Sequence, residues 1–218
     1  MFISYMDTYV QALYTLHEPE DAKTAGREQL QVTKSTTTMI KTDRLSIRRV
    51  IAEDWKAMQQ IWTDISASPY AKYDNPKDTD EALVRSRIER WASVADSMEH
   101  IFFAVCLQDT MIGYVSLNRR SDSYELGYGF HSNYHGQGYA KESLSAIIKW
   151  MTAKGTSCIT AGTALANEPS VRLLLSLGFQ QTGTEDVSFW QDAAGNDIVF
   201  KGGVFSLQTG RLCGIMTI

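Results

Sequence analysis

The sequence has few cysteines, and they do not form recognisable pairs. The three, Cys106, Cys158 and Cys213, lie far apart in the 218 residues and show no Cys-x-x-Cys spacing. An odd number of distant cysteines without a secretion signal argues against a disulfide framework. We therefore expect reduced thiols in a cytoplasmic protein.

The chain also lacks a long apolar segment. No stretch reaches the roughly 18 apolar residues that a membrane-spanning helix requires, and no basic region precedes the first apolar residues. Neither export nor a membrane partner is expected.

An excess of basic residues is missing as well. Lys and Arg total 21 against 25 for Asp and Glu, which gives a net charge of -4. Binding to nucleic acid through counterion release needs a basic surface, so a nucleic-acid partner is not expected. The hydrophobic fraction of 44% and the charged fraction of 21% are instead typical of a soluble globular domain with one packed core.

The first 38 residues differ in pattern from the rest of the chain. Apolar residues recur at helical spacing over residues 2–16, and a polar stretch follows. We expect an N-terminal extension over 1–38 (amphipathic helix plus linker), a folded domain over 39–208 and a C-terminal tail over 209–218. The extension is either a docking arm, consistent with a homodimer, or a dispensable segment before an alternative start at Met39.

From residue 40 onward, strand and helix patterns alternate. The expected strands are 42–50, 101–107, 111–117, 124–130, 157–164 and two flanking residues 193–196, and the expected helices are 52–62, 79–96, about 140–155 and 168–177. Short connections join three consecutive strands, which predicts an antiparallel meander. The expected fold class is mixed α/β (α+β), with a largely antiparallel sheet.

The most informative segment is Gly-Gln-Gly-Tyr-Ala at 136–140, which lies between a predicted strand and a predicted helix. Glycines let the backbone curl around a ligand, and N–H groups at a helix N-terminus bind phosphate oxygens. The pattern indicates either a diphosphate site or a simple turn. A dinucleotide fingerprint would need a small residue in place of Lys141 or Glu142, and a Walker loop would need Gly-Lys followed by Ser or Thr.

A metal site is not expected. His131 and His135 are four residues apart, but they precede the predicted helix and lack the His-Glu pairing of a helical zinc site.

Four segments, in this order, carry a resemblance to a known family. They are Thr-Asp-Arg-Leu-Ser-Ile-Arg at 42–48, Glu-Leu-Gly-Tyr at 125–128, His-Gly-Gln-Gly-Tyr-Ala at 135–140 and Asn-Glu-Pro-Ser-Val-Arg-Leu-Leu-Leu-Ser-Leu-Gly-Phe at 167–179. Together they resemble the GNAT superfamily of N-acetyltransferases, and most of all its ribosomal-protein alanine and serine N-acetyltransferase branch. The resemblance implies acetyl-CoA as co-substrate and a primary-amine acceptor, either a small molecule or a protein N-terminus. It also implies a seven-stranded sheet with a splayed central strand pair and about four helices.

The same resemblance implies a cofactor site. The family loop reads Gln or Arg, two residues, Gly, one residue, then Gly or Ala; Gly138 and Ala140 match, whereas His135 departs from it. Because the loop works through backbone N–H groups, this departure should matter little. The expected cofactor-binding residues are Phe130, His131, His135, Gly136, Gln137, Gly138, Tyr139, Ala140, Lys141 and Asn167. Phe130 and His131 would offer backbone groups to the pantetheine arm, and Asn167 a side-chain amide, unless it is only a helix N-cap.

Gly127 and Gly129 lie in one of the two strands that would separate from each other in the splayed pair. Glycine inside a strand fits a bulge, which would help to open the sheet, and it fits equally well a close-packing requirement.

The resemblance also implies catalytic residues. Glu125 matches the family's glutamate and would be the general base, and a backbone N–H near Phe130 would stabilise the oxyanion. Many members have a tyrosine seven residues after the asparagine, where Leu174 stands here, so Ser170 is the expected general acid. Tyr124, Tyr128 and Tyr134 are possible substitutes. Glu125 can also be interpreted as an ordinary strand carboxylate and Ser170 as a local cap.

The acceptor is only loosely constrained. A protein α-amine with a pKa near 8 is about one-tenth neutral at pH 7, whereas deprotonating a lysine costs about 4.6 kcal/mol. This favours amines of low pKa, although a desolvated pocket could lower the pKa of a lysine as well. The acids and aromatics of loop 64–75 could receive a cationic amine, together with Trp190 of the terminal hairpin, or the loop is simply solvated. The alternative is a catalytically idle acyl-CoA-binding module, which the missing tyrosine and His135 favour and Glu125 and Ser170 disfavour.

Overall fold

The computed structural model describes residues 38–210. The predicted N-terminal helix, most of the predicted tail and Cys213 lie outside these residues. None of the helices between residues 38 and 210 combines the length and apolar character needed to cross a bilayer.

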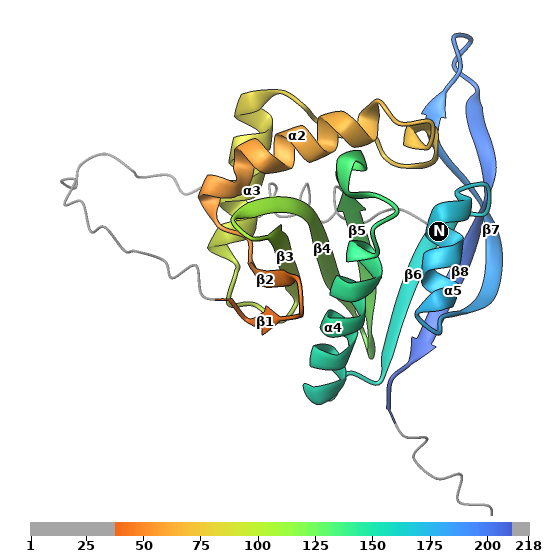
Figure 1. Ribbon diagram of the computed structural model, residues 1–218. Helices are drawn as coiled ribbons and strands as arrows, with labels where there is room; N and C mark the ends of the chain where they lie inside the picture. The colour runs from red at the N-terminus through yellow and green to blue at the C-terminus, as the bar shows by residue number, and fades with distance from the viewer. Residues whose placement is uncertain (1–37, 211–218) are drawn as a thin grey trace, which may run out of the picture. The chain divides into compact units, whose positions relative to one another are not determined.

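The described residues form eight strands and four α-helices, in the predicted order (Figure 1). The strands are β1 (Ile40–Lys41), β2 (Leu45–Arg49), β3 (His100–Leu107), β4 (Thr110–Arg120), β5 (Ser123–Phe130), β6 (Cys158–Ala164), β7 (Gln180–Gln191) and β8 (Asp197–Gln208). The helices are α2 (Trp55–Ser66), α3 (Glu81–Ser93), α4 (Tyr139–Ala153) and α5 (Glu168–Ser176), with short 3-10 turns η1 (Ala52–Asp54), η2 (Ala71–Tyr73) and η3 (Ser132–Tyr134).

All eight strands belong to one sheet, in the order β1-β2-β3-β4-β5-β6-β8-β7. The predicted meander β3-β4-β5 is present, and only β5 and β6 pair in parallel among these strands. The expected count of seven strands was one short. The additional strand, β1, pairs only Ile40 and Lys41 with β2, and two residues are too few to produce a readable alternation.

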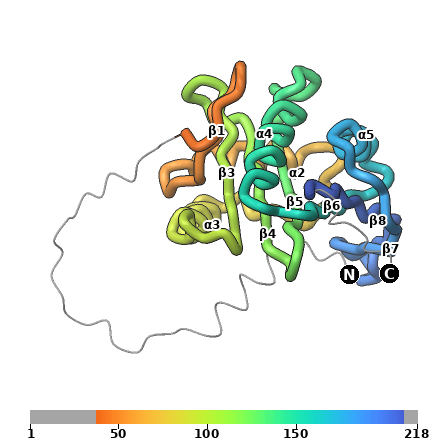
Figure 2. Tube along the Cα trace, turned by 90° about the horizontal axis from the view of Figure 1, so that it is seen from below, coloured from red at the N-terminus to blue at the C-terminus, as the bar shows by residue number. Residues whose placement is uncertain are grey.

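Helices cover both faces of the sheet (Figure 2). This explains why the central strands are almost continuously apolar. Successive side chains on a strand point to opposite faces. Phe102 stacks on Trp91 of α3, with ring centroids 4.1 Å apart. The next residue, Phe103, meets Trp150 of α4 edge-on at 5.7 Å. The side of α2 and α3 and the side of α4 and α5 are therefore the two packed faces.

The sheet opens between β5 and β6. Only Tyr124, Glu125 and Leu126 of β5 pair with β6. Beyond them, β5 stays bonded to β4 as far as Phe130, and β6 stays bonded to β8 as far as Ala164. Each strand is thus held by its outer neighbour while the two inner edges separate. This confirms the predicted splayed pair.

Candidate active site

The turn before α4 has the geometry of an anion-binding site. Gly136 and Gly138 have φ angles of +73° and +83°, in the region that favours glycine. Gly138 is the N-cap of α4, and its carbonyl accepts the N–H of Glu142 at 3.0 Å. In such a helix start, the N–H groups of Tyr139, Ala140 and Lys141 have no acceptor within the helix. N–H groups without an acceptor in the helix and the positive end of the helix dipole therefore meet at this turn.

His135, at the position where the sequence departs from the family loop, ties the turn to β5. Its Nε2 lies 2.8 Å from the carbonyl oxygen of Phe130. Gln137 fixes the turn a second time, since its side-chain amide donates to the carbonyl of Asn133 at 3.1 Å. Both side chains hold the turn in shape by contacts within the protein.

A carboxylate from α2 anchors the preceding η3 turn. Asp64 accepts the Ser132 N–H at 2.7 Å and the Ser132 hydroxyl at 2.6 Å. Burial acts to raise the pKa of Asp64, but the Ser132 hydrogen bonds and the nearby histidines outweigh it, so the pKa lies below its ordinary value. Sequence reasoning missed this anchor, because Asp64 and Ser132 are 68 residues apart.

The backbone groups that face the gap come from Tyr128 and Phe130. His131 donates its N–H to Ile112 of β4 at 3.0 Å, and its carbonyl accepts the N–H of Tyr134 at 3.0 Å. Alternate residues of an antiparallel strand bond the same neighbour, so in the continuous β4–β5 register the N–H and C=O groups of Tyr128 and Phe130 point away from β4. The expectation that His131 offers free backbone groups is therefore wrong, and sequence reasoning missed Tyr128 in this role. Only the register of β4 against β5 reveals it.

Gly127 and Gly129 do not form a bulge, because β4 and β5 pair without a register shift from Gly113 to Arg120. A Cβ on Gly127 would lie 2.7 Å from Ser116 Oγ, and one on Gly129 would lie 2.7 Å from a ring carbon of Tyr114. The close-packing interpretation of these glycines is the one that the structure supports.

Glu125 lies at the closed end of the gap, on the side of α2 and α3. Its side chain is about one-quarter exposed. Arg120 donates to the same carboxylate oxygen, Oε2, from Nε at 2.9 Å and from Nη2 at 2.6 Å. Arg120 was not among the predicted residues, although its position across the β4–β5 hairpin could have suggested it.

Ser170 and Tyr128 meet on the opposite face, beside α5. Their hydroxyl oxygens are 2.7 Å apart. Burial raises the pKa of Tyr128 to about 12, against the opposing effect of the Ser170 hydrogen bond. Leu174, where many family members have tyrosine, is fully buried. Asn167 caps α5 by accepting the Ser170 N–H at 3.4 Å, as the alternative interpretation anticipated.

The segment expected to receive the acceptor does meet the terminal hairpin. Trp190 of β7 donates its indole N–H to the carbonyl of Asp74 at 3.0 Å. Tyr73 of η2 and Phe200 of β8 pack edge-on, with ring centroids 5.4 Å apart. The part of loop 64–75 that follows α2 therefore contacts the β7–β8 hairpin through both a hydrogen bond and aromatic packing.

Comparison with known proteins agrees with this architecture. The chain is 28% identical over 151 residues to an uncharacterised N-acetyltransferase, YoaA, of Bacillus subtilis, covering 66% of this chain and 84% of the relative. The structure of a ribosomal-protein-S5-alanine acetyltransferase from Vibrio fischeri has a TM-score of 0.66 at 18% identity, covering 78% of this chain and 95% of that chain. The structure of the ribosomal L7/L12 α-N-protein acetyltransferase RimL in complex with coenzyme A has a TM-score of 0.66 at 16% identity, covering 77% and 95%.

The family assignment rests on most of the described domain. The acetyltransferase (GNAT) domain matches residues 44–180, a range that runs from the start of β2 to the start of β7 and includes the gap, the glycine turn and α5. The predicted enzyme class is thereby confirmed: the chain belongs to the GNAT acetyltransferase family and is an N-acetyltransferase.

Proposed function

We propose that the protein transfers an acetyl group from acetyl-CoA to a primary amine by direct attack. The observation that carries the proposal is the opening between β5 and β6, whose pairing stops after Leu126. Backbone N–H and C=O groups that leave the ladder need another hydrogen-bond partner, and a ligand with amide groups can supply one. The pantetheine arm, which carries amide groups, would pair with the gap-facing N–H and C=O groups of Tyr128 and with the N–H of Phe130. The Phe130 carbonyl already accepts from His135 Nε2 at 2.8 Å.

The diphosphate of acetyl-CoA would bind at the turn before α4. Gly136 and Gly138 let the backbone approach the phosphates, and the first-turn N–H groups would donate to the phosphate oxygens. Two of the structural neighbours support acyl-CoA chemistry in this fold: one was solved with coenzyme A, and another with acetyl-CoA.

The thioester in the gap would be reached from both faces of the sheet. The amine would approach from the side of α2 and α3, where Glu125 lies. Both donors of Arg120 bond Oε2, so Oε1 is the oxygen that would accept the amine proton, directly or through water. A backbone N–H on the gap-facing edge of β5, near Phe130, would stabilise the oxyanion.

The departing sulfur would lie on the other face, near Ser170. The pKa of Tyr128, near 12, keeps its phenol protonated at neutral pH, so Tyr128 can donate to Ser170 Oγ and leave the serine hydrogen for the sulfur. Overall, the new C–N bond forms and the C–S bond breaks. Glu125 takes one amine proton, the departing sulfur takes the proton of Ser170, and exchange with solvent restores both groups.

The acceptor is proposed to be an amine of low pKa, with a protein α-amine as the first candidate. Such an amine is already partly neutral at pH 7, and it needs only a weak base such as a carboxylate. Two structural neighbours carry names that describe acetylation of ribosomal proteins.

The direct test is release of free CoA from acetyl-CoA with a panel of amines and N-terminal peptides, read also by intact mass. Glu125→Gln should lower the rate about 100-fold or more. The matched control is Glu99→Gln, since Glu99 also pairs with an arginine, Arg119, but lies near the surface end of β3. Equal turnover of Glu125→Gln and the unmodified protein would remove Glu125 from the mechanism.

Binding separates the enzyme from the idle module. Acetyl-CoA at 100 times its dissociation constant should stabilise the fold by about 2.7 kcal/mol. A melting shift without CoA release from any amine would favour the idle acyl-CoA-binding module. The absence of any shift would contradict both.

A further inference from the structure

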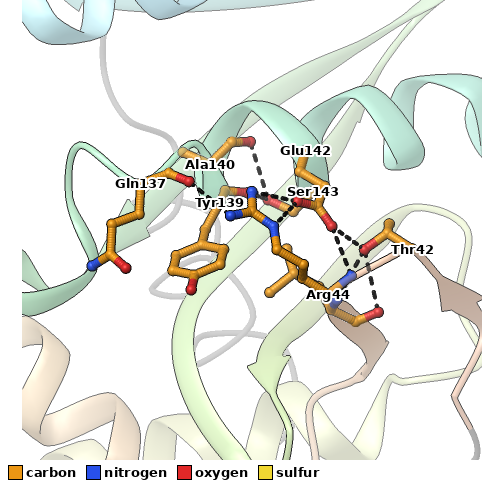
Figure 3. A network of polar contacts seen from close by, with 8 residues as sticks. Thr42, Arg44, Gln137, Tyr139, Ala140, Glu142 and Ser143 are labelled. Carbon is orange, nitrogen blue, oxygen red and sulfur yellow. Dashed lines mark hydrogen bonds and ion pairs between the residues drawn. The ribbon is translucent and has the colours of Figure 1, made fainter.

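Arg44 lies against the glycine turn although it comes from the other end of the domain. It immediately precedes β2, and the turn residue that it contacts is 93 positions away in the sequence. Its Nη1 donates to the carbonyl of Gln137 at 3.0 Å, and its guanidinium lies over the ring of Tyr139, 4.4 Å from the centroid (Figure 3). No role assigned so far uses this side chain.

Glu142, in the first turn of α4, fixes the guanidinium in place. The Arg44 Nε donates to Glu142 Oε2 at 2.7 Å, while the Arg44 backbone N–H and the Thr42 hydroxyl donate to Oε1 at 3.1 and 2.6 Å (Figure 3). Burial acts to raise the pKa of Glu142, but the hydrogen bonds from Thr42 and Arg44 outweigh it, so the pKa lies below its ordinary value. The carboxylate is therefore ionised at neutral pH and compensates the charge of Arg44.

The bond to Gln137 decides how one peptide unit of the turn is oriented. The described chain contains no cis peptide bond, and in a trans peptide the C=O and the following N–H point in opposite directions. Because Arg44 holds the Gln137 carbonyl, the N–H of Gly138 points away from Arg44. Without this bond, the peptide next to a glycine of φ +83° is free to rotate and to present a carbonyl oxygen, which repels anions, instead of an N–H.

We propose that Arg44 is a positioning residue of the diphosphate-binding turn: it fixes the Gln137–Gly138 peptide so that the Gly138 N–H is available to the phosphates. The inference rests on the proposed function, because it assumes that the turn binds the diphosphate of acetyl-CoA. Arg44 acts through hydrogen-bond geometry rather than through net charge, since Glu142 already offsets that charge.

The test compares acetyl-CoA with S-acetylpantetheine, which has the same thioester but no diphosphate. For Arg44→Ala, kcat/KM with acetyl-CoA should fall about tenfold or more, through KM and not kcat, while kcat/KM with S-acetylpantetheine should stay within twofold. Calorimetry with CoA should show the same loss of affinity in the absence of turnover.

Two further variants complete the design. Arg44→Lys keeps the charge but lacks the planar fork that bonds two acceptors at once, so it should remain impaired. Arg85→Ala is the matched control: Arg85 pairs with Glu89 and lies over the ring of Trp55, yet it belongs to α3 and should leave both substrates unaffected. Should Arg44→Ala fail to fold, Glu142→Gln, which weakens the same clamp, should show a smaller loss confined to acetyl-CoA.

Four results would overturn the inference. These are unchanged CoA affinity in Arg44→Ala, equal losses with both substrates, losses in kcat alone, and full recovery in Arg44→Lys. If the protein binds CoA but acetylates no amine, the proposed function is contradicted. In that case, the CoA affinities of Arg44→Ala and the unmodified protein, measured by calorimetry, still decide the role of Arg44. A protein that does not bind CoA contradicts both.

Discussion

Replacing Gly138 by alanine should separate the strain of the backbone from the function of the turn. Gly138 has a φ of +83°, and an added Cβ would lie 3.4 Å from Arg44 Nη2, so the main cost is conformational rather than steric. A left-handed conformation costs a non-glycine residue about 1–2 kcal/mol. For a domain of this size, that corresponds to a fall in Tm of roughly 2–8 °C.

Gly155 provides the matched control at the other end of the same helix. It follows α4 with a φ of +89°, and an added Cβ would meet nothing within 4 Å. Gly155→Ala should therefore lower Tm by a similar amount. It should leave affinity for CoA unchanged, because no part of the proposed cofactor site lies there.

The affinity of Gly138→Ala for CoA should fall much further than its stability suggests. Relieving the strain rotates the neighbouring peptide, which removes at least one N–H donor from the phosphates. A hydrogen bond to a charged group contributes about 1.5–3 kcal/mol, equivalent to roughly a 10- to 100-fold change in Kd. Scanning fluorimetry gives both Tm values and calorimetry gives both Kd values. Equal affinities for the two alanine variants would refute the assignment of this turn to the diphosphate.

Two more predictions concern the hydroxyl pair. Ser170→Ala should lower kcat about 100-fold with little change in CoA affinity, whereas the control Ser176→Ala, on the same helix, should leave kcat unchanged. In a double-mutant cycle, the effects of Tyr128→Phe and Ser170→Ala on kcat should not be additive. Additive effects, or an unchanged kcat in Ser170→Ala, would contradict the pairing of the two hydroxyls. The raised pKa of Tyr128 also makes the free energy of unfolding depend on pH, because the folded state favours the protonated phenol. The stabilisation from this preference is complete below pH 10 and is lost as the pH rises towards 12. The stability of the unmodified protein relative to Tyr128→Phe should fall by up to roughly 3 kcal/mol over that range in denaturant titrations, and parallel curves would show that the phenol is not perturbed.

Local patterns predicted the elements of the fold because their physical causes are local. The apolar spacing of Leu144, Ile147 and Met151 predicted α4, and all three are fully buried. The glycine turn before it is also present, and its two glycines have positive φ angles. The two-residue strand β1 escaped detection, because its pairing depends on the turn to β2 and not on a periodicity of its own.

The arrangement of the site depends on contacts between distant residues, which one sequence does not encode in a readable way. Arg44 and Glu142 are 98 positions apart, and Tyr128 and Ser170 are 42 apart. The assignment of His131 was wrong for a related reason: the direction of a backbone group follows from strand register, and the letters around His131 are compatible with either direction.

The most direct measurement is a crystal structure of the protein with bound CoA. We expect a pantetheine arm between β5 and β6, bonded to backbone groups of Tyr128 and Phe130, with the diphosphate on the N–H groups at the start of α4. A cofactor bound elsewhere, or β5 and β6 closed against each other in its presence, would show that the gap is not the acetyl-CoA site.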